Sequence, residues 1–482
     1  MLLLQCDLAT PLDHFPHPWE HTIGSGYAPL ALRADWQSQL KRCHDELGIE
    51  HVRFHGILSD RMGTMVVHRE EPLYSFFNAD QIMDFLLNSG MRPFVELSFM
   101  PAGLSSGHKT VFSYEGNVTP PENIKDWTIL IEKLVGHWVD RYGVEEVRHW
   151  FFEVWNEPNL HHFWTGNQAD YFDLYRHTFA TIKEIDSSLR VGGPATAQNA
   201  WIPEFIEFGE GHDAPPDFVT THYYPTDAFG EIGADSDTQL ERAPREVMRQ
   251  RAEEARSQAG DRPLYYTEWN TSSNPRHDLH DQPASASFAT RIVMSVRDLV
   301  DGYSIWTFSD IFEENYFPSV PFHGGFGLLN LYGVAKPVYR AYQLMHRLGT
   351  EGREIETGHE TVDAWLTRNG SAITMLLTND AQPRHLIQAE PVKLRLTNAP
   401  RPAHAYLERI DADHANPERL WQEMGSPDYL SPSQVEELRQ DSELRREPIE
   451  FEAKDGVWEC QTQLAEHSVT ALTIEFAAAL DQ

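Results

Sequence analysis

The sequence is poor in cysteine and in positive charge. Its 482 residues include 3 cysteines, Cys6, Cys43 and Cys460, which lie far apart and form no CxxC pair. They do not support a disulfide framework or a zinc ribbon. Lys and Arg number 39 against 73 Asp and Glu, so the net charge is −34. Because this charge repels nucleic acid and anionic membranes, we expect neither as a partner.

Long hydrophobic runs are also missing. No segment reaches the roughly 20 apolar residues of a membrane-spanning helix. The start, MLLLQCDLAT, has three leucines without a preceding basic segment, and Asp7 comes too early for an export signal. We therefore predict a soluble protein of the cytoplasm, where thiols stay reduced.

Hydrophobic residues are plentiful, at 41% of the chain, and aromatic residues make up 11%. These proportions allow a sizeable core. A chain of 482 residues is too long for one ordinary core, so we expect one large domain and a smaller one.

Eight short apolar segments recur along the chain, and each is followed by a polar or Gly/Pro break. They are 20–26, 51–56, 92–99, 149–156, 190–194, 217–224, 262–270 and 302–310. Patterns typical of helices follow at 35–47, 79–90, 126–143, 168–186, 285–302 and 336–349. This alternation predicts parallel strands in a (β/α)₈ TIM barrel, an α/β fold. An open doubly wound sheet is the alternative, but no Gly-rich phosphate loop follows the early strands.

The character of the sequence changes after about residue 350. Residues 361–380 read as two alternating strands joined by a turn at Asn369-Gly370, and 467–476 read as another strand. We predict an accessory β-sandwich formed by 1–13 plus 346–482, with a helical insertion near 417–447. The catalytic barrel would then span 14–345.

Polar and aromatic residues stand where the predicted barrel strands end. In a (β/α)₈ barrel the active site lies at the carboxyl ends of the strands. The residues at these ends are His55, Asn156, Glu157, His222, Tyr224, Glu268, Trp306 and Asp310.

Two of these strand ends carry a carboxylic acid, Glu157 in WNEP and Glu268 in TEWN. Paired carboxylates facing one sugar ring are what glycoside hydrolysis needs, because one protonates the leaving oxygen while the other attacks or activates water. Glu157 could instead cap a helix after Pro158, and Glu268 could form a structural salt bridge. The presence of both motifs on strands four and seven favours catalysis.

Two other classes of function compete with this interpretation. Metal chemistry could use His161, His162, His277 and His280, but the chain has no HExxH motif and no His-x-His at the end of the first strand. We therefore expect no metal and no other cofactor. A non-catalytic sugar-binding barrel would be expected to lack one of the two carboxylates, and both are present.

Several longer motifs resemble a known family in both order and spacing. They are VRFHG, RPFVELSFMP, GNVTPP, RYGVEEV, FEVWNEPNL, VGGPA and WTFSDIFEE. They are similar to the bacterial β-xylosidase branch of glycoside hydrolase family 39, which also includes α-L-iduronidases. The resemblance is dense over about residues 20–345 and looser in the tail.

The resemblance implies a retaining exo-glycosidase that releases xylose from the ends of short xylo-oligosaccharides, as in xylan degradation. Arabinosides, glucosides and iduronides are the alternative substrates, and the oligomeric state is left open. It also implies a set of roles: Glu157 as acid/base, Glu268 as nucleophile, Asn156 for the 2-hydroxyl, His55 and His222 around the sugar, Trp306 as an apolar wall, and Glu313 or Glu314 for other hydroxyls. Tyr224 and Asp310 complete the predicted substrate-binding residues.

The chain departs from the family pattern after strand six. The xylosidase branch reads His-Ala-Tyr there, whereas this chain reads His222-Tyr223-Tyr224-Pro225. We expect Tyr223 and Pro225 to reshape that side of the pocket. Segments 221–231 and 309–317 contain no Lys or Arg, which favours a neutral pentose over a uronate unless a residue such as Arg276 enters the site.

Overall fold

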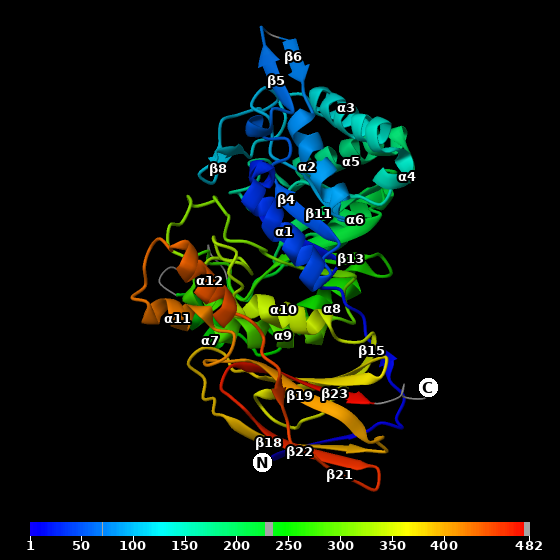
Figure 1. Ribbon diagram of the computed structural model, residues 1–482. Coiled ribbons are helices and arrows are strands. Elements are labelled where there is room, and N and C mark those ends of the chain that lie inside the picture. Colours follow the sequence, from blue (N-terminus) through cyan, green and yellow to red (C-terminus); the bar gives the residue numbers. More distant parts are fainter. Residues whose placement is uncertain (70, 227–234, 477–482) are drawn as a thin grey trace.

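The protein is a (β/α)₈ barrel joined to a β-sandwich, as seen in a computed structural model that describes residues 1–69, 71–226 and 235–476 (Figure 1). The barrel strands follow one another in the order β14-β13-β12-β11-β10-β7-β4-β3, and every adjacent pair is parallel. Phe308 beyond β14 donates to Gly24 O of β3 at 3.0 Å, which brings the two edges together. The barrel strands are β3 (Thr22–Tyr27), β4 (His51–His55), β7 (Arg92–Leu97), β10 (Phe151–Val154), β11 (Arg190–Ala197), β12 (Phe218–His222), β13 (Leu264–Trp269) and β14 (Gly302–Ile305).

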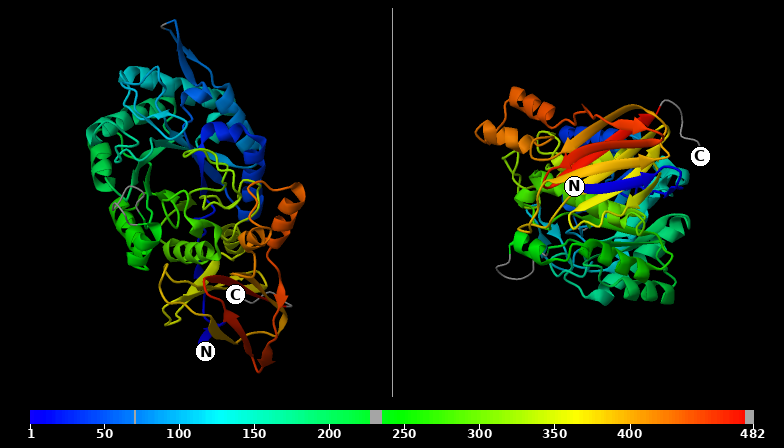
Figure 2. Two further views of the ribbon diagram at one scale, coloured as in Figure 1. Left: turned by 90° about the vertical axis from the view of Figure 1, so that its left-hand side faces the viewer. Right: turned by 90° about the horizontal axis from the view of Figure 1, so that it is seen from below.

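Helices form a ring outside these strands (Figure 2, left). They are α1 (Ala34–Leu47), α2 (Phe77–Asn88), α3 (Ile124–Tyr142), α4 (Val144–Val147), α5 (Gln168–Ile185), α6 (Ile202–Gly211), α7 (Ser236–Arg242), α8 (Val247–Ala259), α9 (Pro283–Val296) and α10 (Pro337–His346), with short 3₁₀ turns at Ala28–Leu32, Asp60–Met62 and Asp278–Asp281. The six predicted helices are confirmed. Helices α4, α6, α7 and α8 were not predicted. Of these, α8 buries Met248 and three alanines but no large apolar stripe.

Two layers of side chains fill the barrel interior. The lower layer is a cluster of four aromatic rings, Phe94, Phe151, Phe218 and Tyr265. Two residues further along their strands, Glu96 and Glu153 point the same way, since side chains in a strand alternate with period two. The upper layer is therefore charged, and it supports the site above it.

Two hairpins lie in the loops that follow β4 and β7. The first comprises β5 (Met65–His68) and β6 (Glu71–Tyr74) and projects at the top of Figure 1. The second comprises β8 (Thr110–Val111) and β9 (Gly116–Asn117). The second hairpin supplies Val111, which lines the cavity described below.

The sandwich packs two sheets around a separate apolar core. The first sheet contains β2 (Asp13–His14), β15 (Glu351–Ile355), β16 (Val362–Asn369), β17 (Ala372–Asn379), β23 (Ser468–Phe476), β19 (Pro402–Ile410) and β20 (Glu447–Pro448). The second contains β1 (Leu2–Asp7), β18 (Glu390–Thr397), β22 (Val457–Leu464) and β21 (Glu452–Lys454). The turn predicted at Asn369-Gly370 joins β16 to β17, with Gly370 at φ 59°.

Two short helices, α11 (Pro417–Glu423) and α12 (Pro432–Asp441), lie in the stretch predicted to be a helical insertion. They pack against the barrel: Trp421 contacts Phe322, and Arg439 donates to Tyr332 O at 2.9 Å. The division into domains at 14–345 and 1–13 plus 346–482 stays a prediction, and residues 70, 227–234 and 477–482 of it lie outside the described part of the chain.

Cys6, Cys43 and Cys460 are buried free thiols. Among the described residues, none of the helices has the length and apolar character needed to cross a membrane.

Candidate active site

A cavity of about 400 Å³ opens at the carboxyl ends of the barrel strands. Its lining includes seven of the predicted site residues, and these are His55, Asn156, Glu157, Tyr224, Glu268, Trp306 and Glu314. An eighth, His222, is fully buried directly beneath, in contact with Glu157. Sequence reasoning from strand ends thus identified most of the groups that the fold brings together.

Glu157 sits on a sharp turn at the end of β10. Trp155 and Glu157 have φ of 71° and 42°, conformations that cost a non-glycine residue about 1–3 kcal/mol. Glu157 N–H donates to Ala195 O at 2.8 Å, which ties the turn to β11. Helix α5 begins only at Gln168 and is capped by Asn167. The alternative in which Glu157 caps a helix after Pro158 is therefore wrong.

Glu268, at the end of β13, accepts hydrogen bonds on both carboxylate oxygens. Arg53 donates to Oε1 at 2.7 Å and the hydroxyl of Tyr224 donates to Oε2 at 3.0 Å. Burial, Glu268 and Glu157 raise the pKa of Tyr224 well above its ordinary value, so the phenol keeps the proton that it donates. The ion pair considered as an alternative does exist, but Glu268 also faces the cavity. Each of its carboxylate oxygens accepts from a donor.

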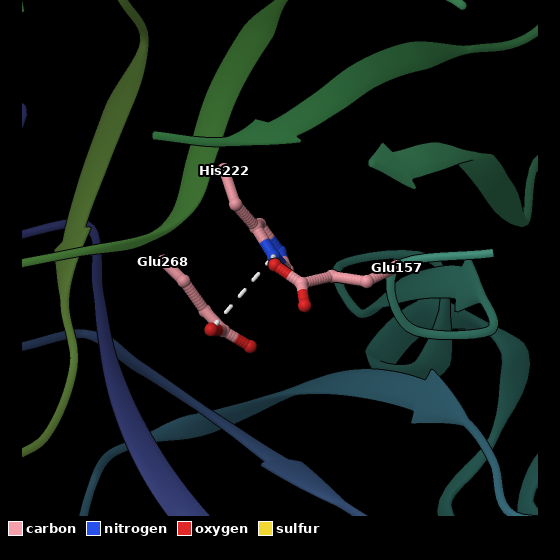
Figure 3. Close-up of side chains that lie close together, drawn as sticks. All are labelled: Glu157, His222 and Glu268. Atoms are coloured by element: carbon pink, nitrogen blue, oxygen red, sulfur yellow. Dashed lines mark hydrogen bonds and ion pairs between the residues drawn. The ribbon is translucent and has the colours of Figure 1, made fainter. Parts of the chain in front are cut away.

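The two carboxyl groups converge from opposite sides of the cavity (Figure 3). One oxygen of Glu157, one oxygen of Glu268 and one ring nitrogen of His222 all lie within 4.8 Å of one another. Carboxyl groups with oxygens this close are nearer the 5–5.5 Å or so of retaining glycosidases than the roughly 6.5–9.5 Å that leaves room for a water in inverting ones. The geometry suits direct attack by one carboxylate.

Three charged residues beneath the cavity were missed by the reasoning from strand ends. Arg53 lies fully buried and contacts Glu96 at 2.8 Å and Glu153 at 2.6 Å, in addition to Glu268. These carboxylates outweigh the effect of burial and raise the pKa of Arg53. The sequence does contain a feature that could have identified them, an ionisable residue in the middle of each of three apolar strands. Such a side chain must find a partner inside the barrel.

Asn156 and His55 are held in place by this charged layer. Arg53 donates to Asn156 Oδ1 at 2.9 Å, which turns the amide nitrogen toward the cavity. His55 Nδ1 lies 2.6 Å from Glu96 Oε2, and its ring centroid lies 4.7 Å from that of Trp306. Burial raises the pKa of Glu96, but His55 and Arg53 outweigh this effect and bring that pKa below its ordinary value.

The two neighbouring glutamates of the loop after β14 point in different directions. Glu314 lines the cavity, with Oε1 3.6 Å from His55 Nε2. Burial and the charges of Glu268 and Glu157 raise its pKa well above the ordinary value. Glu313 is only half-buried. Burial raises its pKa, and the positive charges that oppose this shift belong to Arg61 and Arg33, outside the cavity.

Two other residues singled out from the sequence lie away from the cavity. The carboxylate of Asp310 is fully buried 2.7 Å from Lys336 Nζ and also accepts from Gly327 N–H at 2.8 Å. Tyr223 packs outward, with the guanidinium of Arg251 5.7 Å from its ring centre. The fold therefore does not bring Asp310 to the predicted sugar site, and Tyr224 rather than Tyr223 shapes this side of the cavity.

The basic residue weighed as an alternative, Arg276, lines a separate small cavity with Asp310 and Phe312. The part of the strand-six segment from 227 to 231 lies outside the described residues.

The cluster of Glu157, His222 and Glu268 is compact enough to raise the question of a metal ion. Its chemistry does not fit one, because the guanidinium of Arg53 already contacts Glu268 and a phenol donates to the same carboxylate. Of the histidines considered from the sequence, His277 pairs with Asp237 at 2.9 Å and His280 bonds to Gly324 O at 2.8 Å. No metal is assigned to the described residues.

Comparison with known proteins decides the family. The family model "Glycosyl hydrolases family 39" matches residues 2–456. The chain belongs to glycoside hydrolase family 39. A β-xylosidase of Caldicellulosiruptor saccharolyticus is 46% identical over 463 residues, 95% of each chain. One from Geobacillus stearothermophilus is 35% identical over 489 residues, covering 96% of this chain and 94% of the relative.

A solved structure of similar architecture supports the same assignment. The family 39 enzyme of Xanthomonas axonopodis pv. citri has a TM-score of 0.86 and 36% identity, with 98% of this chain and 97% of that chain covered. This family 39 member is thus a glycoside hydrolase with a TIM barrel and a β-sandwich, as the sequence predicted.

Proposed function

We propose that this family 39 member is a retaining exo-β-xylosidase in which Glu268 is the nucleophile and Glu157 the acid/base. The supporting observation is the close approach of these two carboxyl groups in one cavity, with different partners on each. Donors from Arg53 and Tyr224 hold Glu268 as a carboxylate, whereas Glu157 has the neutral imidazole of His222 beside it. Two acids with opposite protonation states are what a double displacement requires.

In the first step, Glu268 attacks the anomeric carbon and the bond to the leaving oxygen breaks. Glu157 gives its proton to that oxygen, so the leaving group departs as a neutral alcohol. The Asn156 amide donates to the 2-hydroxyl, where hydrogen bonds strengthen as the oxocarbenium-like transition state forms. The charge of Arg53 on Glu268 keeps the nucleophile aligned.

In the second step, water replaces the leaving group. The carboxylate of Glu157 now takes a proton from this water, which attacks the anomeric carbon and releases Glu268. Because the charge of Glu268 is neutralised in the glycosyl-enzyme, the same group can act as acid first and as base second.

A neutral pentose is the sugar that this cavity suits. Among the described residues, its lining includes Glu157, Glu268 and Glu314 but neither Lys nor Arg. Arg53 beneath is already engaged by carboxylates. Burying a uronate beside three acids without a cation costs several kcal/mol. The two relatives described above, both β-xylosidases, support xylose.

The decisive experiment is covalent trapping with an activated 2-fluoro-β-xyloside, followed by mass spectrometry of the peptides. We expect one label, on Glu268. A label elsewhere, or continued turnover without a label, would overturn the role of Glu268. A panel of aryl glycosides then tests the sugar: kcat/KM should be highest for the β-xyloside, and a preference for an α-L-iduronide, arabinoside or glucoside would contradict the substrate while leaving the two glutamates in place.

Product analysis tests the exo mode of action. With xylotriose, an exo-acting enzyme releases xylose as the first product from the non-reducing end. The same assays with chelator should give unchanged rates, since the proposed mechanism uses no metal or other cofactor.

We also propose that the enzyme works in the cytoplasm on short oligosaccharides. Three buried thiols without a disulfide are compatible with a reducing compartment. Cell fractionation with activity in the periplasmic or secreted fraction would contradict this location.

A further inference from the structure

A chain of hydrogen bonds runs from Glu157 down into the barrel core. Glu157 Oε1 lies 3.0 Å from His222 Nδ1, and His222 Nε2 lies 3.0 Å from Thr267 Oγ1. Thr267 in turn lies 2.9 Å from Glu153 Oε1. His222, Thr267 and Glu153 are fully buried, so these groups find their hydrogen-bond partners within the protein.

The direction of the chain follows from Glu153. Its Oε2 accepts from Arg53 Nε at 2.6 Å, and the hydroxyl of Thr220 is a further hydrogen-bond partner. Burial and the charge of Glu96 raise the pKa of Glu153. Its ion pair with Arg53, at 2.6 Å, opposes this effect and holds it as a carboxylate, which can only accept. Thr267 has one hydroxyl proton and therefore donates it to Glu153. Toward His222, the oxygen of Thr267 can then only accept.

This arrangement selects one tautomer of His222. Burial and the positive charge of Arg53 lower the pKa of His222 well below its ordinary value, so the ring is neutral. A neutral imidazole has one N–H and one bare nitrogen. Since Thr267 accepts, the N–H is on Nε2 and Nδ1 is bare. A bare nitrogen 3.0 Å from Glu157 Oε1 makes a hydrogen bond only when Glu157 carries the proton.

We propose that Thr267 is a positioning residue that fixes the Nε2–H tautomer of His222 and thereby holds the catalytic proton on Glu157 in the free enzyme. The inference rests on the proposed role of Glu157 as acid. It adds a residue that touches neither the substrate nor the reacting atoms and acts through two hydrogen bonds.

The same tautomer also serves the second step. After Glu157 has lost its proton, a bare Nδ1 offers the new carboxylate no donor. Glu157 then remains basic and turns to the incoming water instead of being neutralised by His222. Fixing the tautomer thus favours the acid in the first step and the base in the second.

Other titratable groups surround this chain and enter the pH dependence. They are Arg53 and His55 from β4, Glu96 from β7, Glu153 from β10, Tyr224 after β12, Glu268 from β13 and Glu314 after β14. A variant must therefore leave these groups in place, and replacement of the uncharged Thr267 meets that condition.

The test is Thr267→Val, which keeps the shape of the side chain and removes the hydroxyl. His222 can then adopt the Nδ1–H tautomer and donate to ionised Glu157. The alkaline limb of the pH profile of kcat/KM, which reports loss of the acid proton, should move to lower pH by about one unit, the size expected when a hydrogen bond changes sides. The shift should be seen with xylobiose, a substrate that needs the acid.

Two control variants separate this effect from damage to the fold. Thr267→Ser retains the hydroxyl and should keep the wild-type limb. Thr221→Val removes another fully buried hydroxyl, which donates to Thr196 O at 3.0 Å and is not part of the hydrogen-bond chain from Glu157. This variant should also keep the wild-type limb. If Thr267→Val does not fold, Thr267→Ala is the second variant for the same measurement.

Each result supports or overturns the proposal. A uniform fall in rate at every pH with the limb unmoved, or an equal shift in Thr267→Ser, would overturn it. Trapping by the activated 2-fluoro-β-xyloside should proceed in Thr267→Val at the wild-type rate, because it needs Glu268 but not the acid. Failure of that label in the wild-type enzyme would instead contradict the proposed function itself.

Discussion

At the scale of the residue, the two glutamates differ because of their partners. Glu268 is paired with a guanidinium and a phenol, and Glu157 with a neutral imidazole. The backbone adds to this difference, since the positive φ of Glu157 holds its carboxyl over the cavity. Identical side chains can therefore take opposite roles in one site.

The acid role predicts how Glu157→Ala depends on the leaving group. Activity on xylobiose should fall by roughly 10²–10⁴-fold, since general acid catalysis contributes about that much. The first step on a 2,4-dinitrophenyl xyloside should change little, because this leaving group needs no proton. Kinetics on both substrates, with and without azide, check this, and azide should speed deglycosylation. Equal loss on both substrates without rescue would contradict the role.

Glu314 predicts a pH dependence of stability. Its raised pKa means that the folded enzyme keeps a proton that the unfolded chain releases. Such a group stabilises the fold fully below the unfolded pKa, about 4.3, and this stabilisation is lost as pH rises through the folded pKa. Glu314→Gln stays neutral at every pH. The free energy of unfolding of the variant, relative to wild type, should therefore increase as pH is raised from about 4.

The measurement is thermal or urea unfolding of Glu314→Gln and wild type across pH 4–8. Glu122→Gln, at an exposed position, serves as the control and should show no such trend. A constant or falling difference for Glu314→Gln would mean that the carboxyl is ionised in the folded enzyme.

At the scale of the element, β3 carries a glycine, Gly24, where the strand faces Trp306. A Cβ on Gly24 would lie 2.6 Å from Trp306 Cε3 and 3.0 Å from Ile305 O. The strand thus lets Trp306 lie flat against the barrel wall and form one side of the cavity. The WTFSD segment depends on a glycine almost 300 residues earlier in the chain.

Gly24→Ala should push Trp306 into the cavity and raise KM for the aryl xyloside, with a loss of stability of about 1–3 kcal/mol from overpacking. The matched control is Gly136→Ala in α3, where a new Cβ meets nothing within 4 Å. That change should stabilise the helix by about 0.5–1 kcal/mol and leave KM unchanged. Steady-state kinetics and Tm of both variants check this. An unaltered KM in Gly24→Ala would count against the role of Trp306 as one wall of the cavity.

At the scale of the whole molecule, the barrel and the sandwich share a buried ion pair. Arg291 of α9 donates to Asp380, which follows β17, at 2.8 Å, and Ser287 of the same helix donates to the other oxygen at 3.0 Å. Both members of the pair are almost completely buried. The sandwich is thereby attached to the helix that precedes β14, the strand that leads to Trp306.

Asp380→Ala leaves Arg291 buried without its partner and should destabilise the protein by about 3–5 kcal/mol. The change should appear in urea unfolding followed by both fluorescence and activity. Asp45→Ala, which breaks the exposed pair with Lys41, should have little effect. An Asp380→Ala enzyme as stable as wild type would show that the buried pair does not hold the two parts together.

The sequence by itself determined the architecture and the chemical class. Strand and helix periodicity predicted the barrel, because apolar spacing reflects which side of an element is buried. Carboxylates at the ends of strands four and seven predicted two acids in one cavity, because parallel strands of a barrel deliver their carboxyl ends to one face. These features involve residues close together in the sequence, so they can be recognised without the tertiary structure.

Tertiary structure alone decided the neighbours of each group. Whether Glu313 or Glu314 enters the cavity, and that Asp310 meets Lys336 instead, depends on how a loop closes over the barrel. Arg53, Glu96 and Glu153 are far apart in sequence and meet only when the strands close into a barrel. The protonation of Glu157 depends on the same packing, since hydrogen-bond direction is set by contacts among β4, β10, β12 and β13 that spacing along the chain does not encode.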